Sequence, residues 1–276
     1  MTIRWAAPVA AIALSSMAGT AVAQATDAGD QPSTPAPTPI CTDRPTKANV
    51  ACTVPAGAIQ IEADVLNWTR LDAPGAQVDT ILYGNPTLKY GLGATTDVEV
   101  NLAPYETVRT RAQGASDTIG GVGDLYIRLK QQLTRPSAPV QVAVIPYVKA
   151  PTARTGVGNG KVEGGVIAPI VFDLPAGFTL DLGPEVDILA NGEGRGHHVQ
   201  LVGLVNLSKT VGRTTLYGEM WTGQNHDPAA TVRQYSADVA VTYLLTPTLQ
   251  LDVGANFGLN RVTPDVQSYL GIAARF

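Results

Sequence analysis

The sequence has no long apolar stretch once its first residues are passed. Beyond residue 24, no apolar run approaches the roughly 18 to 20 residues that a membrane-spanning helix needs. This absence excludes a helical membrane protein. Yet 45% of the residues are hydrophobic and only 15% are charged, while glycine (28) and proline (20) are numerous. Such a composition leaves a soluble β-protein or a transmembrane barrel, in which only alternate residues face lipid.

Net charge is also small, at −4, which does not indicate a nucleic-acid partner. Histidine occurs only at His197, His198 and His226, and adjacent residues of a strand point to opposite faces. No serine stands in the Gly-x-Ser-x-Gly context of a nucleophile. We therefore expect no cofactor, no metal site and no enzymatic activity, and we interpret the histidines as exposed loop residues.

Cysteine is limited to Cys41 and Cys52, eleven residues apart and just before the first candidate strand. In an exported protein such a pair is expected to form one small disulfide loop. No histidine or second cysteine pair lies nearby to indicate a metal site instead.

The first 23 residues contain the three parts of a secretory signal peptide. Arg4 supplies the positive charge, residues 6–13 the apolar core, and residues 21–23 a small-x-small cleavage site before Gln24. We interpret residues 24–57 as a disordered leader, because its first part is rich in proline, threonine and small residues. Whether residues 41–57 plug the periplasmic mouth or only lead into the first strand stays open.

The rest of the chain alternates with a period of two. The last eleven residues, VQSYLGIAARF, place Leu270, Ile272 and Phe276 on one face of a strand and Tyr269 and Gly271 on the other. A final strand with an apolar row and a terminal aromatic residue resembles the segment that outer-membrane barrels present to their assembly machinery. We predict that Leu270, Ile272 and Phe276 form this assembly signal.

Alternation predicts twelve strands, an even number, as single-chain bacterial barrels require. They cover residues 58–68, 81–90, 96–103, 122–133, 140–150, 161–173, 178–189, 198–208, 214–223, 234–245, 249–259 and 266–276. The connections after odd strands, such as 69–80 and 104–121, are all longer than those after even strands, which is typical of external loops alternating with periplasmic turns. We predict an all-β fold: a transmembrane, antiparallel, up-and-down β-barrel of about 12 strands over residues 58–276, in the bacterial outer membrane.

Three segments and the closing strand carry a family resemblance. The segments are TDRPTKANVACTVPAGAIQIEAD (42–64), GVGDLYIRLKQQL (121–133) and PYVKAPTARTGVG (146–158). They resemble the outer-membrane transporter-like family named for the MetA pathway of phenol degradation. The resemblance implies an outer-membrane barrel that passes small, often aromatic or apolar molecules, and it supplies no catalytic residues.

If the apolar rows face lipid, the charged rows must face the lumen, because a charge facing lipid costs about 2–4 kcal/mol at the midplane. The predicted pore-lining acids are Glu62, Asp64, Asp97, Glu99, Asp124, Glu163, Asp181, Glu185, Asp187, Glu219, Asp238 and Asp252. The predicted pore-lining bases are Lys89, Arg128, Lys130, Lys149, Lys161 and Arg275. Two interpretations compete: a hydrated pore with a mild cation preference, and a packed lumen in which acids and bases pair.

Every predicted external loop carries arginine, at Arg70, Arg109, Arg111, Arg154, Arg195, Arg233 and Arg261. A basic rim would suit the phosphates of lipopolysaccharide, although a simply solvated loop surface explains the same residues. The function we expect is passive passage of a small-molecule solute. The alternatives are a barrel-embedded lipid-modifying enzyme and a non-conducting structural or adhesive barrel.

Overall fold

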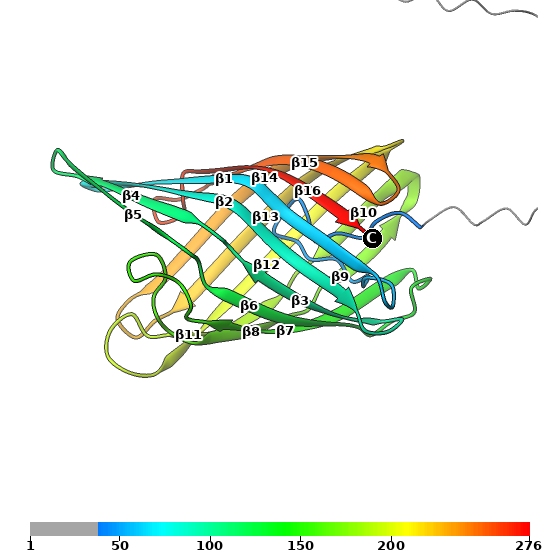
Figure 1. The fold of residues 1–276 in the computed structure, drawn as a ribbon, viewed down its shortest axis with the longest axis horizontal. Helices are drawn as coiled ribbons and strands as arrows, with labels where there is room; N and C mark the ends of the chain where they lie inside the picture. The colour runs from blue at the N-terminus through cyan, green and yellow to red at the C-terminus, as the bar shows by residue number, and fades with distance from the viewer. Residues whose placement is uncertain (1–37) are drawn as a thin grey trace, which may run out of the picture. The chain divides into compact units, whose positions relative to one another are not determined.

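The alternating residues form strand segments of a sheet that closes on itself, because β1 pairs with both β2 and β16. The computed structural model describes residues 38–276 (Figure 1). Its strands are β1 (Ile59–Ala73), β2 (Ala76–Gly91), β3 (Thr96–Leu102), β4 (Glu106–Ala112), β5 (Ala115–Gly121), β6 (Leu125–Gln132), β7 (Val140–Ala150), β8 (Glu163–Ile167), β9 (Ile170–Leu174), β10 (Phe178–Leu182), β11 (Glu185–Ala190), β12 (His197–Val211), β13 (Thr214–His226), β14 (Thr231–Thr246), β15 (Leu249–Gly258) and β16 (Val266–Arg275). Within residues 38–276, no helix is long and apolar enough to span a membrane.

Four pairs of segments are single barrel strands with a short break. The pairs are β3–β4, β5–β6, β8–β9 and β10–β11. The two segments of a pair lie end to end beside the same neighbouring strand: β2, for example, pairs with β3 along one part of its length and with β4 along another. Pro104, Pro169 and Pro184 lie in three of these four breaks, where a residue without an N–H interrupts the ladder. Counted this way the barrel has twelve antiparallel strands, and the predicted fold is confirmed.

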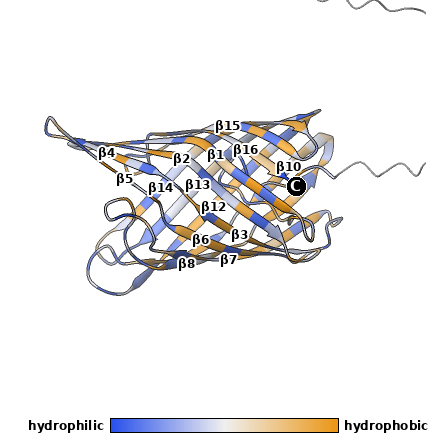
Figure 2. Cartoon of the chain, viewed as in Figure 1, coloured by the Kyte–Doolittle hydropathy of each residue, from blue (hydrophilic) through white to orange (hydrophobic). Residues whose placement is uncertain are grey.

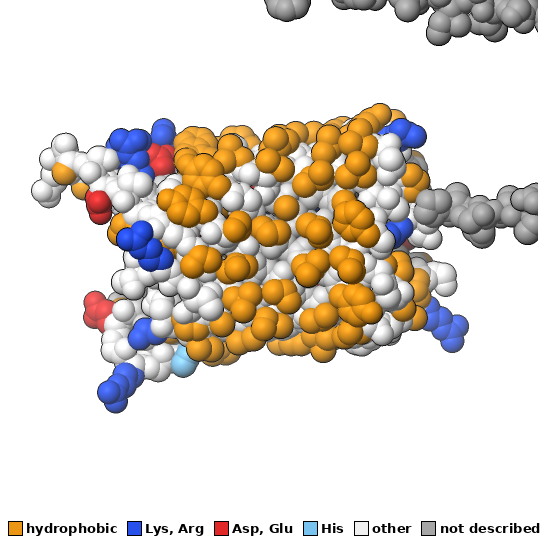
Figure 3. Space-filling model, in the orientation of Figure 1, with side chains coloured by type: hydrophobic (Ala, Val, Ile, Leu, Met, Phe, Trp, Pro, Cys, Tyr) orange, Lys and Arg blue, Asp and Glu red, His pale blue; other side chains and the backbone are white. Residues whose placement is uncertain are grey.

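Two of the predicted external loops are wrong. The β1–β2 ladder continues through the predicted loop 69–80 as far as the pair Ala73 and Ala76, and β4 and β5 occupy most of the predicted loop 104–121. Both hairpins project beyond the apolar belt at the end of the barrel opposite the C-terminus (Figures 1 and 3). Apolar alternation stops where strands leave lipid, so the sequence pattern ends before the strands do.

The barrel is apolar outside and polar inside. Large hydrophobic side chains such as Leu88, Ile127, Val186 and Leu270 are exposed on its outer surface, and they form a belt whose two ends carry the charged groups (Figures 2 and 3). The buried side chains are mainly polar or charged. This arrangement is the inverse of a soluble protein and is the one that a bilayer requires of a barrel wall.

Candidate functional site

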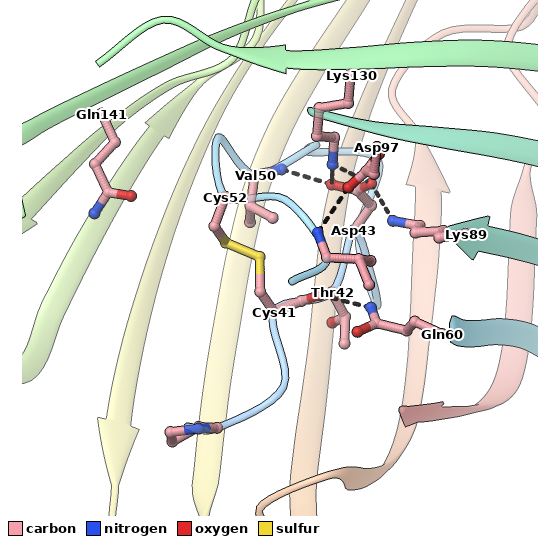
Figure 4. Close-up of a disulfide and its surroundings, with 12 residues drawn as sticks. Cys41, Thr42, Asp43, Val50, Cys52, Gln60, Lys89, Asp97, Lys130 and Gln141 are labelled. Atoms are coloured by element: carbon pink, nitrogen blue, oxygen red, sulfur yellow. Dashed lines mark hydrogen bonds and ion pairs between the residues drawn. A yellow bond between two sulfur atoms is a disulfide. The ribbon is translucent and has the colours of Figure 1, made fainter. Parts of the chain in front are cut away.

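Residues 38–57 fold inside the barrel, in the half nearer the C-terminus, and we call them the plug (Figure 1). A disulfide between Cys41 and Cys52 closes a loop within the plug (Figure 4). The expectation of disorder is wrong for this part of the leader, because the barrel wall offers it charged partners that water does not. The predicted signal peptide and residues 24–37 lie outside the described residues.

One side of the plug faces lysines of the wall. The Asp43 carboxylate accepts hydrogen bonds from Nζ of Lys130 on β6 (2.7 Å) and from Nζ of Lys89 on β2 (Figure 4). Burial alone would raise the pKa of Asp43, but the ammonium groups of Lys130 and Lys89 outweigh it and hold that pKa well below its usual range. Asp43 therefore keeps its charge, and its contribution to the docking of the plug, far into acidic pH.

The opposite side of the plug faces acids of the wall. Arg44 donates Nε (3.0 Å) and Nη2 (2.7 Å) to the carboxylate of Asp252 on β15, and Nη1 to Asp64 on β1 at 2.8 Å. The guanidinium lies against Gly271 on β16, where an added Cβ would stand 1.9 Å from Nη2. A bidentate pair of this kind fixes the orientation of the arginine as well as its position.

A second basic residue of the plug extends the same contact. The Lys47 ammonium pairs with Asp238 on β14 and donates to Ser236 Oγ at 3.1 Å. The carboxylate of Glu219 on β13 accepts the backbone N–H groups of Lys47 (3.2 Å) and Ala48 (3.0 Å). The plug thus presents a negative side to the wall of β2 and β6 and a positive side to the wall of β13–β15 and β1.

Beyond the plug, the barrel encloses a cavity of 630 Å³, which we call the outer cavity. Its lining combines aromatic rings with charged and amide groups. Tyr147 donates its hydroxyl to Asp187 at 2.6 Å, and Gln200 donates to the other oxygen of that carboxylate at 2.9 Å. The rings of Tyr126 and Tyr147 are 6.3 Å apart, and Trp221 contributes a third ring to the lining. A concave space with a few placed polar groups suits a small solute.

A smaller space of 210 Å³, which we call the seam, lies between the plug and the wall of β2, β3 and β6. Asp43, Arg44 and Lys47 of the plug line one side of it. Three residues, Asn85, Asn101 and Arg128, line both the seam and the outer cavity, so the two spaces adjoin.

The charged residues predicted for the lumen lie at different depths inside the barrel. Twelve are buried: Glu62, Asp64, Lys89, Asp97, Glu99, Lys130, Lys149, Asp181, Asp187, Glu219, Asp238 and Asp252. Asp124, Arg128, Glu163, Glu185 and Arg275 are partly exposed, and Lys161 is exposed. Asp124, Arg128, Glu185 and Asp187 line the outer cavity, whereas several of the others bind the plug. Their role in lining a conducting path stays a prediction.

Neither the charges of the plug nor the rings of the outer cavity are predicted from the sequence. Asp43, Arg44 and Lys47 fall in the predicted disordered leader, although two cysteines bracket that part of the chain. The cysteine pair is the feature of the sequence that indicates an ordered loop here, because a disulfide restrains the chain between its two cysteines. Tyr126 and Tyr147 carry no comparable signal, because alternation alone does not tell a cavity from a packed lumen.

Two further expectations about polar residues need correction. His198 lies on β12 and is 9% exposed, with Nδ1 at 3.1 Å from Oδ1 of Asn191, so it is not an exposed loop histidine. Arg70 and Arg111 lie on β1 and β4, and both donate to the buried carboxylate of Asp79. In the part of the chain that the structure describes, no group of three or more histidine, cysteine or acidic side chains could hold a metal ion.

Solved structures share the barrel. An outer membrane channel from Pseudomonas putida F1 is 17% identical, with a TM-score of 0.66, and the match covers 82% of this chain and 98% of that one. The NanC porin is 7% identical with a TM-score of 0.52 (78% and 98% covered), and the β domain of the Bordetella autotransporter BrkA is 12% identical with a TM-score of 0.50 (80% and 100% covered). These likenesses show the fold.

Comparison with curated proteins gives no match. A family model, in contrast, matches residues 42–276, which include most of the plug and the whole barrel. The chain therefore belongs to the family described as "Putative MetA-pathway of phenol degradation".

Proposed function

We propose that the protein is a channel of the bacterial outer membrane for passive passage of small solutes, and that the plug closes it. The observation that carries the proposal is the outer cavity, a 630 Å³ space inside the barrel that adjoins the seam beside the plug. The apolar belt supports a membrane location, and the solved relatives named as a channel and a porin support transport. Passage of this kind needs no catalytic group.

Small aromatic compounds are the solute class that we favour. The family description names phenol degradation. Tyr126, Tyr147 and Trp221 offer ring faces inside the outer cavity, and the carboxylates of Glu185 and Asp187 offer acceptors for a hydroxyl group. A ring with a polar substituent matches this mixed lining better than a bare hydrocarbon does.

The plug favours one rival function, a barrel that conducts nothing. Its ion pairs bind it to the wall on both sides and leave beside it a seam of 210 Å³, as a structural barrel would require. The two functions differ in how the barrel responds to removal of those ion pairs. A closed channel opens, whereas a structural barrel collapses or stays silent.

Single-channel current across a planar bilayer tests the proposal, with the refolded mature chain in a salt gradient. We expect small or infrequent steps from the wild type, and larger or more frequent steps from the double variant Arg44→Gln/Lys47→Gln. Arg135→Gln is the matched control, since Arg135 is exposed in the turn between β6 and β7. Silence from the double variant, with heat-modifiable, barrel-like protein, would contradict the channel.

We also propose two partners. Basic side chains at the end of the barrel opposite the C-terminus, among them Arg195 and Arg233, suit the phosphates of lipopolysaccharide. The closing strand with Leu270, Ile272 and Phe276 suits the outer-membrane assembly machinery. Leu270 and Phe276 are exposed on the outer surface, which supports that second proposal.

A further inference from the structure

Arg128 on β6 stands where the outer cavity meets the seam. Among the described residues that line the outer cavity it is the one lysine or arginine, and it also lines the seam. Any solute or ion that moves from one space to the other passes the wall that Arg128 shares with Asn85 and Asn101. Its charge therefore acts on both spaces, whereas each of the other charged side chains that line them borders one.

The guanidinium of Arg128 is held loosely. Its nearest carboxylate contact is Glu99, at 4.0 Å from Nη1, and its Nε has no hydrogen-bond partner among the described residues. The neighbouring Lys130 on the same strand reaches the plug at 2.7 Å and is 1% exposed, whereas the Arg128 side chain is 27% exposed. Tyr126 lies near the guanidinium, with its ring centre 6.0 Å away.

Acids surround this single cation on the cavity side. Glu106, Asp124, Glu185 and Asp187 all line the outer cavity. Lys149 neutralises Asp124 in part, at 3.3 Å, but Lys149 lines neither space. Without Arg128, every charged side chain that residues 38–276 place on the cavity lining would be negative. A ring of fixed charges of one sign selects ions of the opposite sign.

We propose that Arg128 is the specificity-determining residue of the passage: its charge opposes the entry into the seam of the cations that the acids of the outer cavity attract, and it thereby favours neutral solutes. This inference rests on the proposed channel function. The contact between Arg128 and Glu99 is long, at 4.0 Å, and the buried Glu99 carboxylate also has Lys89 and Lys130 at 3.4 Å. Glu99 therefore keeps two cationic partners when the Arg128 side chain moves aside for a solute. Arg128 thus supplies the charge that opposes cations, and its side chain is the part of the wall that moves where the outer cavity meets the seam.

Reversal potential in a salt gradient tests the inference, measured on the mature chain with the plug contacts intact and in the Arg44→Gln/Lys47→Gln background. We expect Arg128→Gln to raise the ratio of cation to anion permeability at least about threefold, the effect of one unit charge at about 7 Å in water. Arg128→Lys keeps the charge and should keep the wild-type ratio. Arg135→Gln removes the same charge from an exposed turn residue that borders neither space, and should shift the ratio by less than half as much.

The outcomes separate the role of Arg128 from the channel function on which it rests. Current with an unchanged ratio in Arg128→Gln, or an equal shift in Arg135→Gln, would overturn the role of Arg128 and leave the channel intact. A loss of selectivity in Arg128→Lys as large as in Arg128→Gln would overturn the charge barrier. Silence from every variant, including those with the plug contacts removed, would overturn the channel and this inference together.

Discussion

Gly271 on β16 leaves room for the arginine that binds the plug to the wall. The Arg44 guanidinium occupies the space that a side chain would take there, and an added Cβ would lie 1.9 Å from its Nη2. The clash involves the bidentate contact with Asp252, whose side chain is wholly buried. Breaking one partner of a buried pair commonly costs about 3–5 kcal/mol, because the other charge stays buried and unpaired.

We expect Gly271→Ala to displace Arg44 and to loosen the plug while the barrel stays folded. Channel openings in a planar bilayer should become more frequent, and the plug should become sensitive to added protease. Gly218→Ala is the matched control, since an added Cβ on this β13 residue meets nothing within 4 Å. Wild-type openings and protease resistance in Gly271→Ala would show that Arg44 does not hold the plug.

Among the elements, the strands could be predicted from the sequence and the plug could not. Residues 249–259 alternate between apolar and polar, and β15 (Leu249–Gly258) places those two sets on opposite faces. The plug depends instead on pairs distant in the chain, such as Arg44 with Asp252, 208 residues apart. No local pattern records such a pair. The hairpin of β4 and β5 gives no alternating signal, because both of its faces are mainly polar and Val108 and Ile119 are its only large apolar residues.

The Cys41–Cys52 disulfide restrains the plug even when the plug is not docked. It closes a loop with a sequence separation of 11 residues. Closing a loop of that size lowers the conformational entropy of the undocked plug, which favours docking by about 3 kcal/mol. We expect the double variant Cys41→Ser/Cys52→Ser to undock the plug more often and to raise the open probability in a planar bilayer. Far-UV circular dichroism should stay that of the wild type, because the loop contains no barrel strand. Openings as rare as in the wild type would mean that the ion pairs hold the plug without the disulfide.

One ladder of hydrogen bonds between the first and last strands closes the barrel. β1 pairs with β16 from Gln60 and Arg275 to Arg70 and Val266, with a bulge at residues 64–66. Closure removes the two sheet edges, which lipid would leave without hydrogen bonds. The wall that holds Arg44 includes both strands of this ladder, through Asp64 on β1 and Gly271 on β16. Docking of the plug therefore depends on closure of the barrel.

Phe276 lies at the end of this ladder. Its N–H donates to the carbonyl of Ile59 at 2.8 Å, while its side chain is 76% exposed and makes little contribution to packing. The proposed role of Phe276 in assembly therefore predicts an effect on insertion that the packing of the finished barrel does not. We expect deletion of Phe276 to reduce heat-modifiable barrel in isolated outer membranes severalfold, and Phe276→Tyr, which keeps an aromatic ring, to restore it. In contrast, the deleted chain refolded in detergent should reach the wild-type barrel. Equal barrel levels in the membrane with and without Phe276 would contradict its role as an assembly signal. Failure of the deleted chain to refold in detergent would show that Phe276 is needed to close the barrel.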